Sequence, residues 1–360
     1  MKIIHILQNL KGGGIQNLLL SLASAQVRKN NEVTLIVTDK DNLEYSKQLG
    51  TTLESNGVLV IYLNRKIHNK LSTIITIIKC SYWIKKIKPD IINTHGTLCH
   101  IYGAISSLFN KKSTHLITIH NAPELWNTVC LFLNKDKPLI FCSQSAYELN
   151  NHISKDKIVI PNGVDRNIVV TTKQSLLKEE FHLSKDSKLI VSVGSLRKQK
   201  NYHFLVKLAA EYENTNTHFF ICGGHYGKGY IDPTIFTGYK NIHWLGLRSD
   251  VSAIENECDC FISSSTFEGL PIAVLEAFNV GIPCVLSPIP QHENIAQGVY
   301  GCYIPQRFEI TAFKKALNNA LEHTETKSQI YKFRKEKLSE YSIEKTANQY
   351  INFYSEILKK

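Results

Sequence analysis

The chain has 360 residues, of which 43% are hydrophobic and 20% are charged, and these proportions are ordinary for a soluble globular protein of about two domains. It contains no apolar run long enough to span a membrane, and the apolar part of its start is too short for a secretion signal. The nine cysteines are odd in number and form no C-x-x-C pair, which favours buried thiols over disulfides or a zinc site. We therefore expect a cytoplasmic protein.

The formal net charge of +11 is unevenly distributed. Residues 1–165 hold 19 Lys and Arg against 11 Asp and Glu, a surplus of 8, whereas residues 166–360 hold 23 against 20, a surplus of 3. A basic first half favours an anionic membrane surface or an acidic partner. Nucleic acid would suit the charge equally well, but no recognised nucleic-acid-binding motif accompanies it, so we expect no such partner.

The first predicted strand covers residues 2–8 and leads into three consecutive glycines, Gly12, Gly13 and Gly14. An apolar helix over 15–27 follows. A strand, a glycine loop and a helix in this order resemble the start of a dinucleotide-binding fold, but the G-x-G-x-x-G spacing is absent. The glycines serve either a tight turn or the close approach of a ligand.

Residues 64–88 predict a helix with two sets of side chains. The apolar set is Leu71, Ile74, Ile75, Ile78, Trp83, Ile84 and Ile87. The basic set is Arg65, Lys66, Lys70, Lys79, Lys85, Lys86 and Lys88. This pattern fits a packed core helix with a solvated basic face, and it also fits an interfacial segment that touches anionic lipid.

Two further strands, predicted over 90–94 and 116–119, are each followed by a histidine, His95 and His120. The carboxyl ends of parallel strands form the edge of a sheet at which ligands bind, so both histidines are candidate site residues. The alternative for each is a satisfied structural histidine. The segment 157–165 contains a Pro-Asn-Gly turn that suits a domain boundary.

The alternation of strands and helices restarts after a polar connector. A strand over 189–193 leads into Gly194 and the cationic loop 195–201, and two later strands end at Gly223 and Gly246. A cationic loop that follows a strand and opens a helix is well suited to clamp a pyrophosphate. A solvated run of charge is the alternative.

Residues 261–286 predict a strand, a Ser/Thr-rich loop, a helix that begins near Pro271, a Gly-Ile-Pro break and a second strand. This loop would aim the free N–H groups of a helix start at the sheet edge where anionic ligands collect. Two carboxylates frame the helix, Glu268 before it and Glu276 within it. Glu268 alone could simply favour the positive end of the helix. Glu276 has apolar neighbours, so its charge needs partners, and sugar hydroxyls are such partners.

The full pattern, S-x-x-E-G-L-P-x-x-x-L-E-A-x-x-x-G-x-P, resembles the Glu-x7-Glu signature of retaining glycosyltransferases with the GT-B fold, specifically glycosyltransferase family four. The resemblance runs from the glycine loop to the last helix. It implies an α/β protein with two doubly wound, Rossmann-like domains that face a cleft. The acceptor-binding domain would comprise residues 1–168, the nucleotide-sugar-binding domain 169–342, and a helix over 343–360 would cross back onto the first domain.

The resemblance also implies a set of site residues. The catalytic residues would be Glu268, Lys200 and His120. The donor-binding residues would be Gly13, Gly14, Gly194, Arg197, Lys200, Gly223, Leu247, Arg248, Glu268, Gly269, Leu270, Pro271 and Glu276. We place Gly12 and His95 on the acceptor side. The family has an arginine where this chain has Ser195, so either Arg197 takes that role or Lys200 and backbone amides suffice.

The implied reaction moves a hexose or N-acetylhexosamine, with retention, from a nucleotide-sugar that is most readily UDP-linked. The expected acceptor is a lipid-linked saccharide in the synthesis of lipopolysaccharide O-antigen or capsule, which would bring the protein to the anionic inner face of the cytoplasmic membrane. No cofactor is expected. The triplet Asp39-Lys40-Asp41 matches a D-x-D metal motif but lies in a short polar turn, so no essential metal is expected either. Two rival functions remain, a non-hydrolysing sugar-nucleotide epimerase and a non-catalytic nucleotide-sugar-binding protein.

Overall fold

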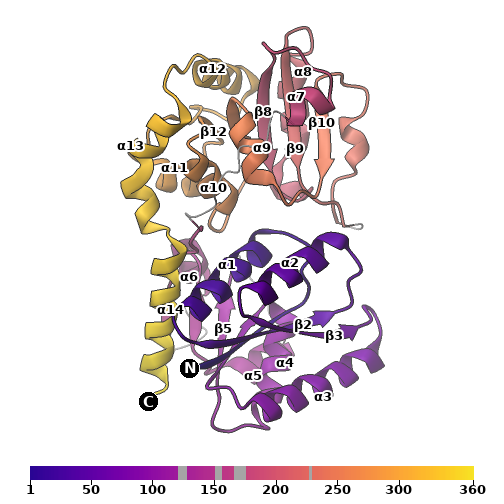
Figure 1. Ribbon diagram of the computed structural model, residues 1–360, viewed down its shortest axis with the longest axis vertical. Helices are drawn as coiled ribbons and strands as arrows, with labels where there is room; N and C mark the ends of the chain where they lie inside the picture. The colour runs from indigo at the N-terminus through magenta and orange to yellow at the C-terminus, as the bar shows by residue number, and fades with distance from the viewer. Residues whose placement is uncertain (121–127, 151–155, 166–175, 227–228) are drawn as a thin grey trace. The chain divides into compact units, whose positions relative to one another are not determined.

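A computed structural model describes residues 1–120, 128–150, 156–165, 176–226 and 229–360. The chain forms two compact units, a first unit made of Met1–Asp165 with Ser342–Lys360 and a second unit made of Arg166–Tyr341 (Figure 1). The expected boundary between residues 168 and 169 lies outside the described residues. Each unit is built on one parallel β-sheet flanked by helices, which is the α/β organisation that the sequence predicts.

The sheet of the first unit has the strand order β3-β2-β1-β4-β5-β6-β7, and all its neighbouring strands are parallel. The strands are β1 (Lys2–Leu7), β2 (Glu32–Asp39), β3 (Leu59–Arg65), β4 (Ile91–His95), β5 (Thr114–Ile119), β6 (Leu139–Phe141) and β7 (Lys157–Val159). The central strands are continuous apolar runs because helices cover both faces of the sheet. β3 and the helix before it were not predicted.

The helices of the first unit include one from the far end of the chain. They are α1 (Gly14–Arg28), α2 (Glu44–Ser55), α3 (Lys70–Ile87), α4 (Thr97–Ser107), α5 (Thr128–Asn134), α6 (Gln144–Asn150) and α14 (Ile343–Ile357). Tyr350 and Tyr354 of α14 are fully buried in the same core cluster as Leu18 and Leu22 of α1. The Tyr354 hydroxyl also accepts a 2.9 Å hydrogen bond from the Asn93 side chain on β4. The C-terminal helix therefore crosses back onto the first unit, as expected.

The helix α3 differs from the helix predicted over 64–88 in its start and in its orientation. Asn64 and Arg65 end β3, and the Arg65 guanidinium is buried against Asp39 at 2.7 Å, so Arg65 is not part of a basic helix face. The side chains that α3 buries are Thr76, Cys80, Ser81 and Ile84. The side chains that it exposes include Leu71, Ile74, Ile75, Ile78 and Tyr82. Four of the seven predicted apolar residues are therefore exposed, whereas Ile84 is buried and Trp83 and Ile87 pack against the core, so the prediction of a packed core stripe holds only for the C-terminal part of α3.

The sheet of the second unit has the strand order β10-β9-β8-β11-β12-β13, again parallel throughout. The strands are β8 (Lys188–Val193), β9 (Thr217–Cys222), β10 (Ile242–Gly246), β11 (Cys260–Ser263), β12 (Cys284–Leu286) and β13 (Cys302–Tyr303). The helices are α7 (Leu176–Glu180), α8 (Tyr202–Ala210), α9 (Val251–Glu257), α10 (Ile272–Val280), α11 (Pro290–Ala296), α12 (Ile310–Leu321) and α13 (Lys327–Glu340). Two short 3-10 turns, η1 (Lys198–Lys200) and η2 (Pro233–Phe236), complete it.

Two further expectations concern the whole chain. All nine cysteines are free thiols, and eight of them are buried, as the absence of C-x-x-C pairs predicts. Among the described residues, no helix combines the length and the apolar composition that a bilayer span requires.

Candidate active site

Glycines form the backbone hydrogen bonds at the carboxyl edge of the second sheet. The backbone N–H of Gly194, after β8, donates to the Cys222 carbonyl at 2.9 Å, and the N–H of Gly223, after β9, donates to the Gly246 carbonyl at 2.7 Å. A Cβ atom added at Gly223 would lie 1.8 Å from the carbonyl oxygen of Gly194, and one added at Gly194 would lie 2.7 Å from Cε of Lys200. Gly223 must be glycine because backbone packs directly against backbone there, whereas a side chain at Gly194 would meet the Lys200 side chain.

The loop after β8 brings Lys200 to Glu268, two predicted catalytic residues that lie far apart in the sequence. Nζ of Lys200 lies 2.6 Å from Oε1 of Glu268. The Gln199 side-chain amide donates to Oε2 of the same carboxylate at 3.0 Å. The hydroxyl of Ser264, directly after β11, donates to the Lys200 carbonyl at 2.9 Å and so ties the two loops together. Both oxygens of Glu268 therefore accept a hydrogen bond.

The Glu268 carboxylate is only 8% exposed. Burial raises the pKa of this carboxyl, but the Lys200 ammonium, hydrogen bonds from Lys200 and Ser265, and the nearby His292 together bring the pKa below its usual range. Glu268 is thus a buried carboxylate that remains ionised at neutral pH. Such a group accepts hydrogen bonds from sugar hydroxyls, while the ammonium beside it suits a phosphate oxygen.

Helix α10 begins next to this pair. Pro271 is the N-cap residue, one position before the first turn in which the sequence placed it. The Pro271 carbonyl accepts the N–H groups of Val274 at 3.0 Å and Leu275 at 3.2 Å. No acidic residue lies in the first helical turn, so the positive end of the helix is left to Gly269 and Leu270 and the backbone around them.

Glu276 lies on α10 and is partly buried. Burial raises the pKa of its carboxyl to about 7, although the charge of Lys200 opposes this rise. The fully buried Glu255 of α9 is close enough that the charge of Glu276 adds to the rise that burial causes in the pKa of Glu255. Glu276 is therefore divided between its neutral and ionised forms near neutral pH.

Two predicted donor-binding arginines have partners of their own. The Arg197 guanidinium donates to the Tyr230 hydroxyl at 3.0 Å and lies over the Tyr230 ring at 5.3 Å. Arg248, which follows Leu247 after β10, forms two hydrogen bonds of 2.8 and 2.7 Å with Asp250. Neither guanidinium contacts the Lys200–Glu268 pair among the hydrogen bonds of the described residues, so the structure does not bring these two arginines together with it.

The remaining predicted residues belong to the first unit. Gly12 and Gly13 have φ angles of 88° and 148°, and Gly14 begins α1. His95 is the last residue of β4 and His120 directly follows β5. The ring nitrogens of these two histidines, Nδ1 of His95 and Nε2 of His120, lie 2.8 Å apart.

Several residues at these places were not predicted from the sequence. They are His5, Gln26, Gln199, Tyr202 and His292. Gln199 contacts Glu268, and the Tyr202 hydroxyl donates to the Gly194 carbonyl at 2.6 Å. The only signal for Gln199 was its place in the cationic loop, and the only one for Tyr202 was its place directly after that loop. His5 had none beyond its position in the first strand, because the residues that it meets come from other strands.

Comparison with known proteins identifies the family. The family model described as Glycosyltransferase Family 4 matches residues 12–167, and that described as Glycosyl transferases group 1 matches residues 173–337. The Escherichia coli UDP-Gal:alpha-D-GlcNAc-diphosphoundecaprenol alpha-1,3-galactosyltransferase is 26% identical over 349 residues, which are 88% of this chain and 87% of that protein. The O-antigen biosynthesis glycosyltransferase WclY of Escherichia coli is 23% identical and covers 81% of each chain.

A solved structure shows the same fold. The crystal structure of Anabaena Alr3699/HepE in complex with UDP-glucose has the same fold, with a TM-score of 0.78 and 19% identity over 100% of this chain and 99% of that chain. The two family models together cover the chain from the glycine loop to α13. The chain therefore belongs to glycosyltransferase family four and is a GT-B glycosyltransferase that uses a nucleotide-sugar.

Proposed function

We propose that this glycosyltransferase moves a hexose or N-acetylhexosamine from a UDP-sugar, with retention of the anomeric configuration, to a lipid-linked saccharide in the assembly of a bacterial surface polysaccharide. The observation that carries the proposal is the Lys200–Glu268 pair beside the start of α10. The ammonium and the helix start suit the negative charge that develops on a departing diphosphate. The names of two relatives, a galactosyltransferase that acts on a diphosphoundecaprenol and an O-antigen glycosyltransferase, support the acceptor class.

In this mechanism Lys200 neutralises the leaving diphosphate, while Glu268 accepts hydrogen bonds from the sugar. Glu276 would accept hydrogen bonds from the ribose, and His120 would meet the donor sugar. Lys200 and Gln199 each donate to one oxygen of Glu268. Because both oxygens of this carboxylate are already engaged, Glu268 is poorly placed to act as a covalent nucleophile. Retention would then follow from attack of the acceptor hydroxyl on the same face from which the diphosphate departs.

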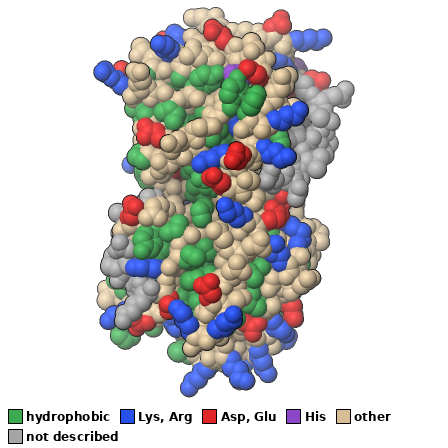
Figure 2. Space-filling model, turned by 90° about the vertical axis from the view of Figure 1, so that its left-hand side faces the viewer, with side chains coloured by type: hydrophobic (Ala, Val, Ile, Leu, Met, Phe, Trp, Pro, Cys, Tyr) green, Lys and Arg blue, Asp and Glu red, His purple; other side chains and the backbone are tan. Residues whose placement is uncertain are grey.

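The surface of α3 supports a peripheral position at a membrane. Its exposed apolar side chains, Leu71, Ile74, Ile75, Ile78 and Tyr82, lie outside the core. Residues 66–88 contain six lysines and no Asp or Glu. An apolar face flanked by lysines is complementary to an anionic lipid surface, where hydrocarbon lies beneath negative headgroups. We call this face the α3 surface and propose the anionic cytoplasmic leaflet as its partner. On the face of the molecule in Figure 2, Lys and Arg side chains also gather at the lower edge.

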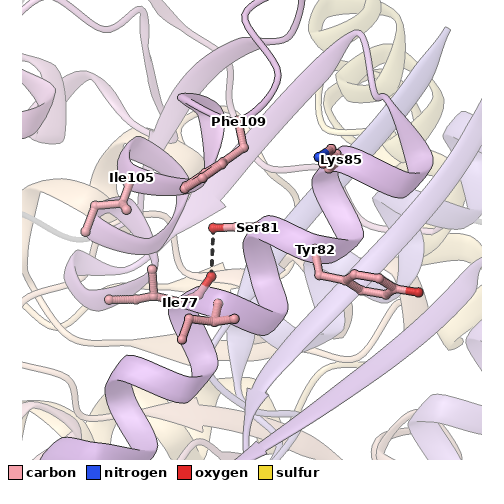
Figure 3. A pocket seen from close by; sticks show the side chains of 7 residues that line it. Ile77, Ser81, Tyr82, Lys85, Ile105 and Phe109 are labelled. Carbon is pink, nitrogen blue, oxygen red and sulfur yellow. Dashed lines mark hydrogen bonds between the residues drawn. The ribbon is translucent and has the colours of Figure 1, made fainter.

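A groove of about 440 Å³ runs along one side of the α3 surface. Side chains from α3, from α4 and from the turn just after α4 line it, namely Ile77, Ile78, Ser81, Tyr82, Lys85, Ile105 and Phe109 (Figure 3). The Ser81 hydroxyl donates a hydrogen bond to the Ile77 carbonyl at 2.8 Å, so its polar group is satisfied within α3. The groove is thus an apolar hollow with a single cation, Lys85, at its rim, which extends the apolar contact available to lipid chains.

The test of the function is a transfer assay with purified protein. UDP-galactose, UDP-glucose and their N-acetyl analogues are each incubated with a synthetic N-acetylglucosaminyl-diphospholipid, and the products are analysed by mass spectrometry and by the anomeric coupling constant in proton NMR. We expect one donor to give an α-linked product. A β-linked product would overturn retention. An epimerised donor formed without acceptor would establish the epimerase, and binding of donor without any turnover would establish a non-catalytic protein.

The residue assignment needs variants with a matched control. Glu268→Gln keeps the size of the side chain and removes its charge, and we expect turnover to fall by a factor of about 100 or more because the ion pair is lost. Glu211→Gln is the control, since Glu211 lies on the surface of the same unit and pairs with Lys314 at 3.2 Å. Equal turnover in the two variants would remove Glu268 from the site.

A further inference from the structure

Arg334 of helix α13 is a fully buried cation. It is 0% exposed, and its guanidinium donates to the backbone carbonyls of Tyr300 at 2.8 Å, Ile282 at 2.8 Å and Gly301 at 3.1 Å. A guanidinium keeps its charge in a folded protein, and a buried charge is costly unless an opposite charge accompanies it. The hydrogen bonds that the described residues make with Arg334 include no carboxylate. Another group has to supply the negative charge.

Two cysteine sulfur atoms flank this guanidinium. Nη1 of Arg334 lies 4.0 Å from Sγ of Cys284, and Nη2 lies 4.0 Å from Sγ of Cys302. Cys284 begins β12 and Cys302 begins β13, and the two residues are directly opposite each other in these paired strands. A thiol that loses its proton becomes a thiolate, which is the negative charge that a buried guanidinium requires.

The surroundings of the two sulfur atoms determine which of them carries the charge. Burial raises the pKa of the Cys302 thiol, but the hydrogen bond from Cys284 and the charge of Arg334 together bring this pKa below its usual range, although Cys260 on β11 opposes them. Burial raises the pKa of Cys284 well above its usual range, and the hydrogen bond to Cys302 raises it further. Cys284 therefore keeps its proton, and Cys302 is the thiolate of the pair.

Cys302 also differs from the other cysteines in its access to solvent. The structure describes all nine cysteines, and Cys302 is the one that is not buried. Together with Tyr303 and His323, it is among the residues that line a pocket of about 510 Å³. The ring of His323 is engaged there, with Nδ1 at 2.8 Å from the Tyr303 hydroxyl and Nε2 at 3.3 Å from Oε2 of Glu325. A small polar reactant can therefore approach Cys302 from the pocket.

We propose that Cys302 is a modification site at which a peroxide oxidises the thiolate, and that Cys284 then converts the product into a disulfide. The Cys302 sulfur attacks an oxygen of the peroxide that carries hydrogen, so an S–O bond forms and the O–O bond breaks. The rest of the peroxide leaves as hydroxide or alkoxide. The sulfur loses two electrons, the peroxide gains them, and Cys302 becomes a sulfenic acid. No substrate of the transfer reaction takes part, so this inference is independent of the proposed function.

The second step uses the thiol that already lies beside the first. The Cys284 sulfur attacks Sγ of the sulfenic acid, so an S–S bond forms and the S–O bond breaks. The hydroxyl group leaves as water with the proton of Cys284. Neighbouring strands lie about 4.8 Å apart, which is within the separation of about 4.4–6.8 Å that a disulfide allows between Cα atoms. The directly opposed register of the two cysteines therefore permits the bond.

Peptide mapping by mass spectrometry measures which thiol is oxidised first. The purified protein is treated with increasing hydrogen peroxide, and the remaining thiols are blocked with iodoacetamide. We expect the first product to be a disulfide between Cys284 and Cys302 that dithiothreitol reverses. In Cys284→Ser, Cys302 should stop at the sulfenic acid, which dimedone traps. In Cys302→Ser, Cys284 should stay reduced at the same dose.

Three outcomes of this mapping would overturn the proposal. They are oxidation of another cysteine before Cys302, oxidation of wild-type Cys302 without a disulfide to Cys284, and oxidation of Cys284 in Cys302→Ser at the wild-type dose.

The charge of Cys302 is measured in the wild-type protein by the pH dependence of its alkylation. We expect the rate with iodoacetamide to reach half of its maximum at a lower pH than the rate of glutathione measured alongside. Cys260, which is 0% exposed, should react at least about 10 times more slowly at pH 7. A half-maximal pH at Cys302 equal to or above that of glutathione would overturn the proposal.

The contribution of Arg334 is measured by two substitutions. Arg334→Met removes the cation, and we expect alkylation of Cys302 at pH 7 to slow about 10-fold, whereas Arg334→Lys keeps the charge and should keep part of the rate. Arg307→Met is the control, since Arg307 lies on the surface of the same unit, 4.0 Å from Glu309, and it should leave the rate unchanged. A wild-type rate in Arg334→Met, or equal slowing in both Arg334 variants, would overturn the proposal. Where Arg334→Met does not fold, the wild-type pH profile decides.

Discussion

Nζ of Lys200 lies 2.6 Å from Oε1 of Glu268, so the cation assigned to the diphosphate and the carboxylate assigned to the sugar form one ion pair. Their side chains are 20% and 7% exposed, and little water screens them from each other. A diphosphate that binds Lys200 therefore weakens the attraction between Lys200 and Glu268. A sugar that binds Glu268 in turn changes the electrostatic potential at Lys200. The two halves of a nucleotide-sugar would be recognised together.

Replacement of Lys200 by methionine should show this coupling in both turnover and stability. Lys200→Met leaves Glu268 buried without its cation, so we expect the free energy of unfolding to fall by about 3–5 kcal/mol and turnover to fall by a factor of about 100 or more. The double variant Lys200→Met/Glu268→Gln should regain most of the stability but none of the turnover. Urea unfolding and the transfer assay measure the two quantities. Lys314→Met is the surface control, and a double variant no more stable than Lys200→Met would contradict the coupling.

Glu276→Gln should change stability in a pH-dependent way. The folded-state pKa of about 7 lies above the usual carboxyl value of 4.5, so between these values the folded state binds more protons than the unfolded state. Stability is then lost as pH rises through this window, and glutamine removes that loss. We expect the variant to have the higher Tm at pH 8, by about 2–4 °C, and no advantage at pH 4.5. Its affinity for the UDP-sugar should nevertheless be lower.

The same comparison of Tm at pH 4.5 and pH 8 provides the control for Glu276. Glu211→Gln, on the exposed surface of the second unit, should leave the difference between the Tm values at pH 4.5 and pH 8 unchanged. If Glu276→Gln lowered Tm at pH 8, the carboxylate would be stabilising there and its raised pKa would be refuted.

Gly223→Ala tests the backbone contact at the sheet edge. The added Cβ would meet the Gly194 carbonyl oxygen at 1.8 Å, and neither group can move without shifting β8 or β9. We expect a loss of about 1–3 kcal/mol in stability and a larger loss in donor affinity, measured by calorimetric titration with UDP. Gly224→Ala is the neighbouring control, because the atoms nearest to its methyl group belong to the Tyr226 side chain and not to the backbone. Equal effects at the two positions would contradict the assignment.

The α3 surface predicts a dependence on anionic lipid. Neutralising two of its lysines with Lys85→Gln/Lys86→Gln should reduce binding to vesicles of phosphatidylglycerol by about 30-fold, at about 1 kcal/mol for each lysine, and should have no effect with neutral vesicles. Ile78→Glu should reduce binding to both kinds of vesicle because it removes apolar contact. Vesicle flotation measures this, with Phe333→Glu on α13, an exposed phenylalanine of the second unit, as the control. Flotation that is the same for anionic and neutral lipid would contradict the proposal.

The elements of the site could be predicted because their signals are local. The glycines after β8 and β9, the cationic loop and the run from Glu268 to Glu276 each show their chemistry within a few residues, and the structure brings Lys200 and Glu268 together. Sequence periodicity also located α3, but it did not tell which face packs. Thr76, Cys80 and Ser81 recur with the same helical spacing as the isoleucines, and the neighbouring strands decide which set is buried.

The contacts that could not be predicted all depend on the order of strands or loops. His5 and His95 are 90 residues apart and meet because β1 and β4 are neighbours in the sheet. Arg65 forms an ion pair with Asp39 because β2 and β3 are paired in the sheet. Arg197 finds Tyr230 across a loop. Each of these side chains is ordinary in its local sequence, and only the fold gives it a partner.

The helix Ile343–Ile357 completes the core of the unit that starts at Met1. During synthesis the ribosome must therefore release the whole second unit before α14 can pack on α1, so the part of α1 that α14 covers stays open while the chain between Arg28 and Ile343 is made. Folding of the first unit is thus tied to the synthesis of α14, and a truncation before α14 disables the part that was made first.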